Sequence, residues 1–248
     1  GGEMGSLIRA KDWSKTTIGD PEIWPQSLRT TLSIIINSKF PMFLWWGPEL
    51  ICFYNDAYRP SLGKNGKHPE ILGMPAEKAW PEIWEIIQPL IQQVQDGGES
   101  TWSEDQLIPI FRNGKIEDVY WTFSYSPVID ENGNVAGVLV TCSETTEKIN
   151  AFKNLEESNQ RYLNNIMRAP AAMCIFMGKN HIVEIANQHM LNLMGQTESS
   201  VLNKPIFEGI PEAKGQGFEK LLDNVFNTGE SFVANEFPVT LPRNGIVE

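Results

Sequence analysis

Asn55–Gly63 (NDAYRPSLG) is the most informative stretch of the sequence, because its pattern returns as Asn187–Gly195 (NQHMLNLMG) at an offset of 132 positions. Each stretch has Asn, an apolar residue three positions later, a second apolar residue four positions after that, and then Gly. Arg112–Gly114 returns as Arg243–Gly245 at an offset of 131. Offsets that agree so closely predict two copies of one module within the 248 residues.

The segments around this stretch predict a sheet in the first copy. Met42–Trp46 and Leu50–Tyr54 have the composition of two short apolar strands across a turn. Val119–Ser126 alternates aromatic and hydroxyl side chains, and Val135–Thr141 is β-branched and apolar, with an Asn-Gly turn between them. Two such runs indicate a hairpin. We expect further strands over 100–106 and 107–111.

Helical patterns lie between the predicted strands. Thr30–Asn37, Asp56–Leu62 and Ala76–Trp80 are short, and Ile83–Gln95 carries apolar residues at helical spacing. Pro89 should kink or restart the last of these helices. Short helices alternating with strands that follow one another in hairpins predict an α+β domain with one antiparallel sheet.

A helix without Gly or Pro is predicted over 144–167, between the two copies. We therefore expect a first domain with an N-terminal helical extension at 1–143, a connecting helix at 144–167 and a second domain at 168–248. Glu248 corresponds to Glu117 of the first copy, so the second copy is expected to stop before its last two strands. It should then expose unpaired backbone or borrow strands from a neighbouring molecule.

The connecting helix carries apolar residues on a heptad seam near its two ends. These residues are Ile149, Phe152, Leu163 and Ile166. Glu156 and Asn159 occupy the middle of the seam, where a coiled coil prefers apolar residues. A solvated spacer helix and a dimerising helix are both compatible with so short a seam.

Composition excludes several partners and compartments. The net charge is −11 and no basic cluster exists, so we expect no nucleic-acid partner. Cys52, Cys142 and Cys174 are too few and too scattered for a disulfide framework. The apolar runs fall far short of the roughly 18 residues of a membrane span, and the N-terminus has no signal pattern. We expect a soluble, cytoplasmic chain without membrane contact.

No residue pattern predicts catalysis or a metal site. Cys174, His181 and His189 are spaced unlike any zinc signature. The adjacent acids Glu104 and Asp105 should point to opposite faces of a strand, so they cannot bracket one glycosidic bond. A small-molecule hydrolase would need a nucleophile–base pair, which the sequence does not suggest. We expect neither catalytic nor metal-binding residues in this chain.

Several motifs are characteristic of one family. In the first copy they are Asp12–Ser14, Trp24–Arg29, Phe40–Leu44, Tyr54–Tyr58, Trp80–Trp84 and Phe123–Pro127. In the second copy they are Ala169–Ala171, Ile185–Asn187 and Leu193–Gly195. With these motifs the first copy resembles a PAS sensory domain of bacterial sensor histidine kinases, and the second copy resembles a more generic PAS domain.

The resemblance implies a five-stranded antiparallel sheet with short helices on one face, which enclose a pocket. It also implies that the last strand leads into a helix that passes a signal onward, at an Asp-x-Thr junction. Glu144 and Thr146 stand at the matching positions, the acid being one methylene longer. The Gly-x-Asn-Cys-Arg-Phe-Leu-Gln stretch of flavin-binding PAS domains is absent, and His68 and His189 match a haem-ligand position poorly. We therefore expect no cofactor.

Aromatic residues of the first copy are the candidates for the pocket, since all eight tryptophans lie within its first 121 residues. The candidates are Trp45, Tyr54, Asn55, Tyr58, Trp84 and Tyr125, together with Trp80 and Phe123. The aromatic side chains either line a pocket or fill the core. Asn55 either caps local backbone or contacts a ligand, and its recurrence as Asn187 favours the cap.

The resemblance implies a sensory and regulatory function. PAS domains would sense a small molecule or another signal, and the helical linker would transmit it to a downstream histidine kinase of a two-component system. A homodimer through the helices is the expected assembly. The alternative is a ligand-free PAS scaffold that mediates dimerisation or protein–protein interaction.

Overall fold

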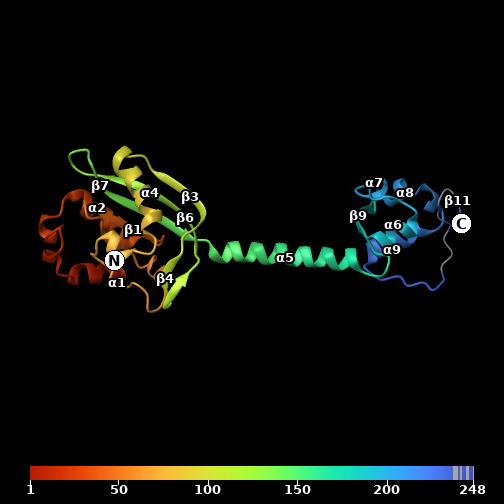
Figure 1. Ribbon diagram of the computed structural model, residues 1–248, viewed down its shortest axis with the longest axis horizontal. Coiled ribbons are helices and arrows are strands. Elements are labelled where there is room, and N and C mark those ends of the chain that lie inside the picture. The colour runs from red at the N-terminus through yellow and green to blue at the C-terminus, as the bar shows by residue number, and fades with distance from the viewer. Residues whose placement is uncertain (237–239, 241, 244–245, 248) are drawn as a thin grey trace. The chain divides into compact units, whose positions relative to one another are not determined.

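The computed structural model describes residues 1–236, 240, 242–243 and 246–247 (Figure 1). The chain divides into two compact units, Gly1–Lys153 and Asn154–Glu248. Each unit has a hydrophobic core of its own. In the described part of the chain, no helix is both long and apolar enough to cross a membrane.

A five-stranded antiparallel sheet forms the centre of the first unit. Its strands are β1 (Met42–Trp46), β2 (Ile51–Tyr54), β3 (Thr101–Leu107), β6 (Tyr120–Ile129) and β7 (Val135–Glu144). They lie in the order β2-β1-β7-β6-β3, and each neighbouring pair is antiparallel. The α+β class and the five-stranded sheet predicted for the first copy are therefore confirmed.

Alternation of side chains determines which face of this sheet is buried. Along β6, Trp121, Phe123 and Tyr125 are buried, while the residues between them are partly covered. The register of β6 with β7 places Cys142 opposite Phe123 and Val140 opposite Tyr125, so these side chains share one face. The inner face of the sheet is consequently aromatic and apolar.

Helices cover the inner face of the sheet (Figure 1). They are η3 (Arg59–Leu62), α3 (Ala76–Ala79) and α4 (Trp84–Gly97), and α4 packs against β6 and β7. The predicted helix Asp56–Leu62 is shorter in the structure and forms only the 3₁₀ turn η3. Gly63 ends this turn with a φ of 68°, a backbone conformation that favours glycine.

Helix α4 continues through Pro89, so the helix does not restart at this proline. Pro89 lies at an exposed position, where its ring displaces no core residue. Ile87, Ile91 and Val94 form the buried stripe of α4 on both sides of it. Burial of this stripe outweighs the backbone hydrogen bond that a proline removes from a helix.

The N-terminal extension packs onto β2 through two tryptophans. It contains α1 (Gly2–Ala10), η1 (Trp13–Lys15), η2 (Pro21–Ile23) and α2 (Gln26–Asn37). The ring of Trp13 stacks on Phe53 with centroids 4.9 Å apart, and Trp24 meets both rings edge-on. Helix α2 begins at Gln26 rather than at the predicted Thr30, because Leu28 extends its buried stripe.

A small hairpin is inserted between β3 and β6. Its strands, β4 (Ile110–Arg112) and β5 (Lys115–Glu117), form a separate two-stranded sheet. The strand predicted over 107–111 is therefore wrong as a continuous element, because the chain leaves the main sheet after Leu107. Ile108 and Ile110 are buried where the hairpin begins.

The second unit repeats the start of the first. Helix α5 (Thr146–Arg168) runs across the division of the chain and is followed by β8 (Cys174–Met177), β9 (Ile182–Ala186) and α6 (Gln188–Met194). The remaining elements are α7 (Glu198–Val201), α8 (Ile206–Gly209), η4 (Pro211–Ala213), α9 (Phe218–Thr228), β10 (Pro242–Arg243) and β11 (Ile246–Val247). Among the described residues of this unit, the strands form two separate two-stranded sheets.

Candidate functional site

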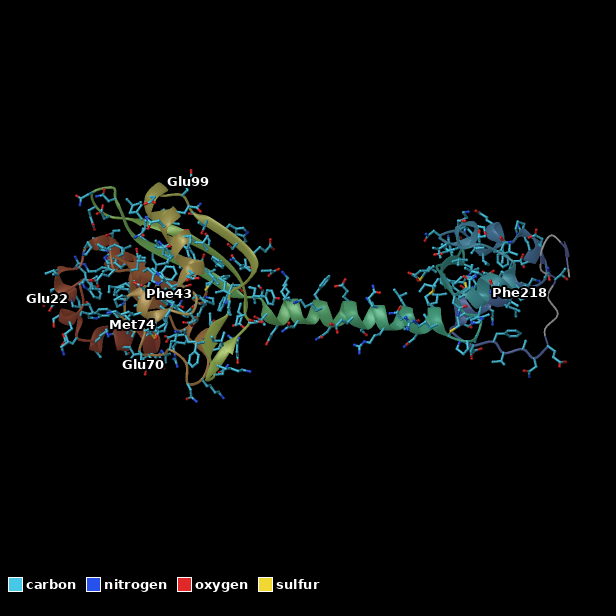
Figure 2. The ribbon with its side chains drawn as sticks, viewed as in Figure 1. Glu22, Phe43, Glu70, Met74, Glu99 and Phe218 are labelled. Carbon is cyan, nitrogen blue, oxygen red and sulfur yellow. The ribbon has the colours of Figure 1, made fainter. Side chains whose placement is uncertain are left out.

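A cavity of about 50 Å³ lies between the inner face of the sheet and the helices of the first unit. Its aromatic lining consists of Phe43, Trp45, Tyr58, Trp80, Trp121, Phe123 and Tyr125. Phe43, which lies among the packed side chains of this unit, is labelled in Figure 2. The remaining lining residues are Ile83, Ile87, Ile108, Ile110, Val140 and Cys142. None of these side chains carries a formal charge, so the cavity is aromatic and neutral.

The structure brings together some of the predicted pocket residues. Trp45, Tyr58 and Tyr125 line the cavity, as do Trp80 and Phe123. Tyr58 is within ring-contact distance of Phe43 and Trp121, and Tyr125 of Trp45 and Phe123. The cavity therefore lies inside one continuous aromatic cluster.

Tyr54, Asn55 and Trp84 lie outside the lining of the cavity, so their assignment to the pocket does not hold in this structure. The hydroxyl of Tyr54 instead hydrogen-bonds to Nδ1 of His68 at 2.8 Å. Trp84 is partly buried at the first position of α4 and packs against the core outside the cavity.

Asn55 caps backbone at the end of β2, as its recurrence in the second copy suggested. Its side-chain nitrogen donates to the carbonyl oxygens of Ile35, Ser38 and Phe40. Its side-chain oxygen accepts from the backbone nitrogens of Met42 and Tyr58 at 3.1 and 3.0 Å. Asn55 is completely buried, so every polar atom of its amide is used by the fold.

Several of the lining residues were not predicted from the sequence, and one signal, the alternation of side chains along a strand, could have found some of them. Trp121 lies two positions before Phe123 on β6, so strand alternation places it on the same face. Cys142 and Val140 follow from the same rule on β7. Ile108 and Ile110 could not be found this way, because they follow the point at which the chain leaves the sheet.

The cavity contains no activated nucleophile. Burial raises the pKa of the Cys142 thiol to about 12, so the reactive thiolate is scarce at neutral pH. Burial also raises the pKa values of the Tyr58 and Tyr125 hydroxyls, so both stay protonated. These groups can hydrogen-bond to a molecule in the cavity but are poorly suited to attack it.

The predicted junction residues Glu144 and Thr146 lie where β7 passes into α5. Two guanidinium nitrogens of Arg112 donate to the two carboxylate oxygens of Glu144, each at 2.8 Å. The third nitrogen of the guanidinium donates to Glu117 at 2.8 Å. These hydrogen bonds, with Glu144 first, raise the pKa of Arg112 above its ordinary value. A β4 residue therefore holds the end of β7.

The first turn of α5 is attached to the sheet as well. The Tyr120 backbone nitrogen donates to Oγ1 of Thr146 at 3.0 Å, and the Thr145 nitrogen donates to the Tyr120 carbonyl at 2.8 Å. Lys148 forms an ion pair with Asp105 of β3 at 3.0 Å. Three separate contacts therefore connect the start of α5 to β6 and β3.

The second unit has an apolar cavity of about 230 Å³ that the sequence did not indicate. Phe176, Met190, Ile206 and Phe218 are among the residues that line it, and Phe218 is labelled in Figure 2. Over the described part of the chain, no three His, Cys, Asp or Glu residues are grouped as a metal site would require.

Two family comparisons agree with this geometry. The family model for the PAS fold matches residues 51–150, and the model for the PAS domain matches residues 170–245. The chain contains two PAS domains. PAS domains are in general signal-sensing modules without catalytic activity of their own. The first match begins at β2, and the structure adds β1 and the N-terminal extension to this PAS domain.

The solved structures to which the chain is similar are distant in sequence. An RNA-binding light-oxygen-voltage receptor is 17% identical over 59% of this chain, with a TM-score of 0.39, and the chain covers 41% of that receptor. The PAS domain of BvgS from Bordetella pertussis is 18% identical over 54% of this chain and 97% of its own, with a TM-score of 0.38. A sensory box sensor histidine kinase from Vibrio cholerae is 15% identical over 47% and 85%, with a TM-score of 0.32. No curated protein sequence matches the chain.

Proposed function

We propose that the chain is the sensory part of a histidine kinase of a two-component system. The first PAS domain receives a signal in its aromatic cavity, and α5 transmits the change towards a catalytic kinase domain in the same protein. The observation that carries this proposal is the position of Arg112. It follows Ile108 and Ile110, which line the cavity, and it holds Glu144 at the start of the connecting helix.

A second set of contacts connects the hairpin to the helical wall of the cavity. The backbone nitrogen of Phe111 donates to Glu82 at 3.0 Å, and Glu82 forms an ion pair with Lys67 at 3.0 Å. Lys67 lies over the ring of Trp80, with its nitrogen 5.2 Å from the ring centroid. A displacement of Trp80 or of Ile110 would therefore strain β4 of the hairpin.

The free energy of the Arg112–Glu144 contact limits how strongly a change at the cavity can affect the start of α5. Arg112 is 13% exposed and Glu144 29% exposed, so solvent screens the pair only in part. A bidentate, charge-assisted contact of this kind contributes roughly 1.5–3 kcal/mol. If the first domain has two conformations that differ at the junction, a ligand shifts the equilibrium between them only to the extent that it binds them with different affinity.

The transmission route is tested by Glu144→Gln, with hydrogen exchange of backbone amides as the readout. We expect amides in the first two turns of α5 and in the β4–β5 hairpin to exchange about tenfold faster. Glu147→Gln is the matched control, because Glu147 is an exposed acid in the first turn of α5, three residues after Glu144. The proposed transmission route would be overturned if backbone amides in both segments exchanged as slowly in Glu144→Gln as in the original protein.

The kinase assignment needs a separate experiment on the full-length protein. We expect ATP to label it with an acid-labile phosphate on histidine, and Glu144→Gln to change the rate of labelling. Labelling that is absent, or that is confined to serine, threonine or tyrosine, would contradict the histidine-kinase assignment. It would not affect the proposed transmission route through Arg112.

A ligand-free scaffold is the second candidate, and the small volume of the cavity favours it. Pockets for small molecules usually enclose roughly 300–1,000 Å³, against about 50 Å³ here. Native mass spectrometry and an absorption spectrum of the purified protein distinguish the two. A retained small molecule supports the sensor. A protein that never retains or binds one supports the scaffold.

A further inference from the structure

One short segment of the first PAS domain contacts the start of α5 through two ion pairs. The segment is residues 105–112, which we call the strap, and it runs from Asp105 near the end of β3 to Arg112 at the end of β4. Nζ of Lys148 donates to Asp105 at 3.0 Å, and Arg112 donates to the two carboxylate oxygens of Glu144, each at 2.8 Å. Lys148 lies in the first turn of α5, and Glu144 is the last residue of β7. Both ends of the strap therefore contact the junction.

The middle of the strap is part of the cavity wall. Ile108 and Ile110 are 5% and 3% exposed, and both line the aromatic cavity. Ile108 lies three residues after Asp105, and Ile110 lies two residues before Arg112. Pro109 between them has a fixed φ, and a chain spans at most roughly 3.3–3.6 Å per residue, so the strap has little slack. A displacement of this wall is therefore passed to both ends of the strap.

The backbone at Asp105 departs from regular strand geometry. The pairing of β3 with β6 shifts register between Ser103 and Gln106, which marks a β-bulge. Asp105 has a φ of 47° there, in the left-handed region that costs energy for a residue other than glycine, although Asp tolerates it better than most residues. Bulges often change the direction in which a side chain points. We attribute this bulge to the contacts of the Asp105 carboxylate.

Thr122 of β6 supports the bulge between β3 and α5. The backbone nitrogen of Asp105 donates to Oγ1 of Thr122 at 3.1 Å, and this hydroxyl donates to Oδ1 of Asp105 at 3.4 Å. Oδ2 accepts from Lys148. The side chain of Asp105 is 25% exposed and that of Lys148 is 66% exposed. An ion pair this exposed contributes little to stability, so its effect on α5 lies in the direction that it imposes.

The two ends of the strap contact the junction at two different points and with opposite charges. Arg112 binds an acid at the end of β7, and Asp105 binds a base four residues later, in the first turn of α5. A helix attached at one point can swivel about it, whereas two points fix its direction. A movement of the strap acts on both points together and so turns the first turn of α5 relative to the end of β7.

We propose that Asp105 and Lys148 are positioning residues, which form the second of two arms through which the strap sets the direction of α5. The inference rests on the proposed function, because it adds a residue pair to the transmission that starts at the same cavity. Loss of the Arg112 arm leaves α5 attached through Lys148. Loss of the Asp105 arm leaves it attached through Glu144, and a displacement of the wall then no longer turns the helix.

Asp105→Asn and Lys148→Gln test the pair by removing one charge each. Asn also tolerates the left-handed conformation and keeps an oxygen acceptor for Thr122, so Asp105→Asn leaves the bulge in place. We expect each variant to accelerate amide hydrogen exchange in the first two turns of α5 about threefold, and the double variant to add nothing further. Glu104→Gln is the matched control, because Glu104 is the neighbouring acid in the same bulge and is exposed.

Ile110→Val removes one carbon from the cavity wall and tests whether the wall and α5 are connected through the strap. We expect this change to shift the backbone amide resonances of Glu147 and Lys148 in NMR spectra. The shift should fall to less than half in an Asp105→Asn background and keep its full size in a Glu104→Gln background. A pair that only stabilised the helix would not change this response. The dispersion of the amide resonances shows that each variant is folded.

The proposal is overturned if Asp105→Asn leaves amide exchange in α5 unchanged, or if the effects of Asp105→Asn and Lys148→Gln are additive. It is also overturned if Ile110→Val shifts the α5 resonances equally with and without the charge of Asp105. Failure of the proposed function differs from these outcomes. In that case α5 responds to Ile110→Val through Asp105 as expected, but the full-length protein carries no phosphate on histidine.

Discussion

Asn55 and Asn187 show how completely a single side chain can be used by a fold. In the second PAS domain, the nitrogen of Asn187 donates to the carbonyls of Ile166, Ala169 and Ala171. Its oxygen accepts from the backbone nitrogens of Met173 and Met190. Asn55 has the corresponding five partners in the first domain. Each amide connects the end of a helix, the start of one strand and the turn after the next strand.

Asn55→Ala should therefore destabilise the first domain strongly. The substitution leaves buried carbonyl and N–H groups without a partner, and we expect a loss of about 3 kcal/mol in the free energy of unfolding. Urea denaturation followed by tryptophan fluorescence measures this loss selectively, because all eight tryptophans precede residue 122. Asn150→Ala, at an exposed position of α5, is the control and should change stability by less than about 0.5 kcal/mol. A loss below about 1 kcal/mol for Asn55→Ala would contradict the structural role.

Trp13→Phe and Trp80→Phe should differ in stability although they remove the same atoms. The Trp13 substitution breaks the hydrogen bond to the Ile8 carbonyl, while the Trp80 indole has no bond to lose. We expect Trp13→Phe to cost about 1 kcal/mol more in the free energy of unfolding than Trp80→Phe. Equal losses in urea denaturation would count against an unsatisfied indole at Trp80.

At the scale of elements, the β4–β5 hairpin is held by a charge that acid removes. The hydrogen bond from Arg112, followed by that from Asn113, keeps the pKa of Glu117 below its usual value of 4.5. Because the folded-state pKa is lowered, the charged form favours the folded hairpin. The stabilisation is present above about pH 4.5 and is lost as the pH falls through the lowered pKa.

The amide resonances of Arg112 and Gly114 should report this titration. In a pH series by NMR, we expect them to shift with a midpoint below 4.5. In Glu117→Gln the same transition should be missing. A midpoint at or above 4.5, or an unchanged transition in Glu117→Gln, would show that Arg112 does not hold this carboxylate.

The sequence predicts the regular elements well and the contacts between distant segments poorly. Alternation along Val119–Ser126 was sufficient to identify β6, and the paired runs identified the β6–β7 hairpin. The β4–β5 hairpin was missed because its strands have three residues each, too few for a periodic signal.

The site was predicted only in part, for the same physical reason. Trp45, Tyr58 and Tyr125 were found because aromatic residues on predicted strands and helices tend toward the core. Tyr54 and Trp84 satisfied the same pattern but pack elsewhere. The Arg112–Glu144 contact joins residues 32 positions apart. A pattern of neighbouring residues in the sequence cannot predict such a long-range contact.

At the scale of the whole molecule, exposed apolar residues on α5 suggest how two copies would associate. Phe152, Leu155 and Tyr162 are 66%, 59% and 58% exposed, and their spacing puts them on one face of the helix. Ile166 of the predicted seam is 5% exposed and so is not free to pair. We propose that a homodimer forms through this face, with Asn159 at a central position of the seam, where a polar residue can fix the register.

Light scattering tests the dimer directly. We expect the protein to be dimeric at micromolar concentration, and Phe152→Ser combined with Leu155→Ser to weaken the dimer at least tenfold. Asn154→Ser, on the other side of the helix, should have no effect. A protein that remains monomeric at high concentration would contradict the dimer, and so would a double variant that dimerises as well as the original chain.

The bonds of Asn187 to Ile166 and Ala169 also bear on how tandem sensors exchange modules during evolution. The last turn of α5 belongs to the fold of the second domain, just as the end of α2 belongs to the fold of the first. A gene fusion with its breakpoint at residue 169 would transplant a sensor without the carbonyl that its buried amide needs. Productive recombination is expected upstream, in the exposed middle of α5, where a cut separates the two compact units and leaves both amides satisfied.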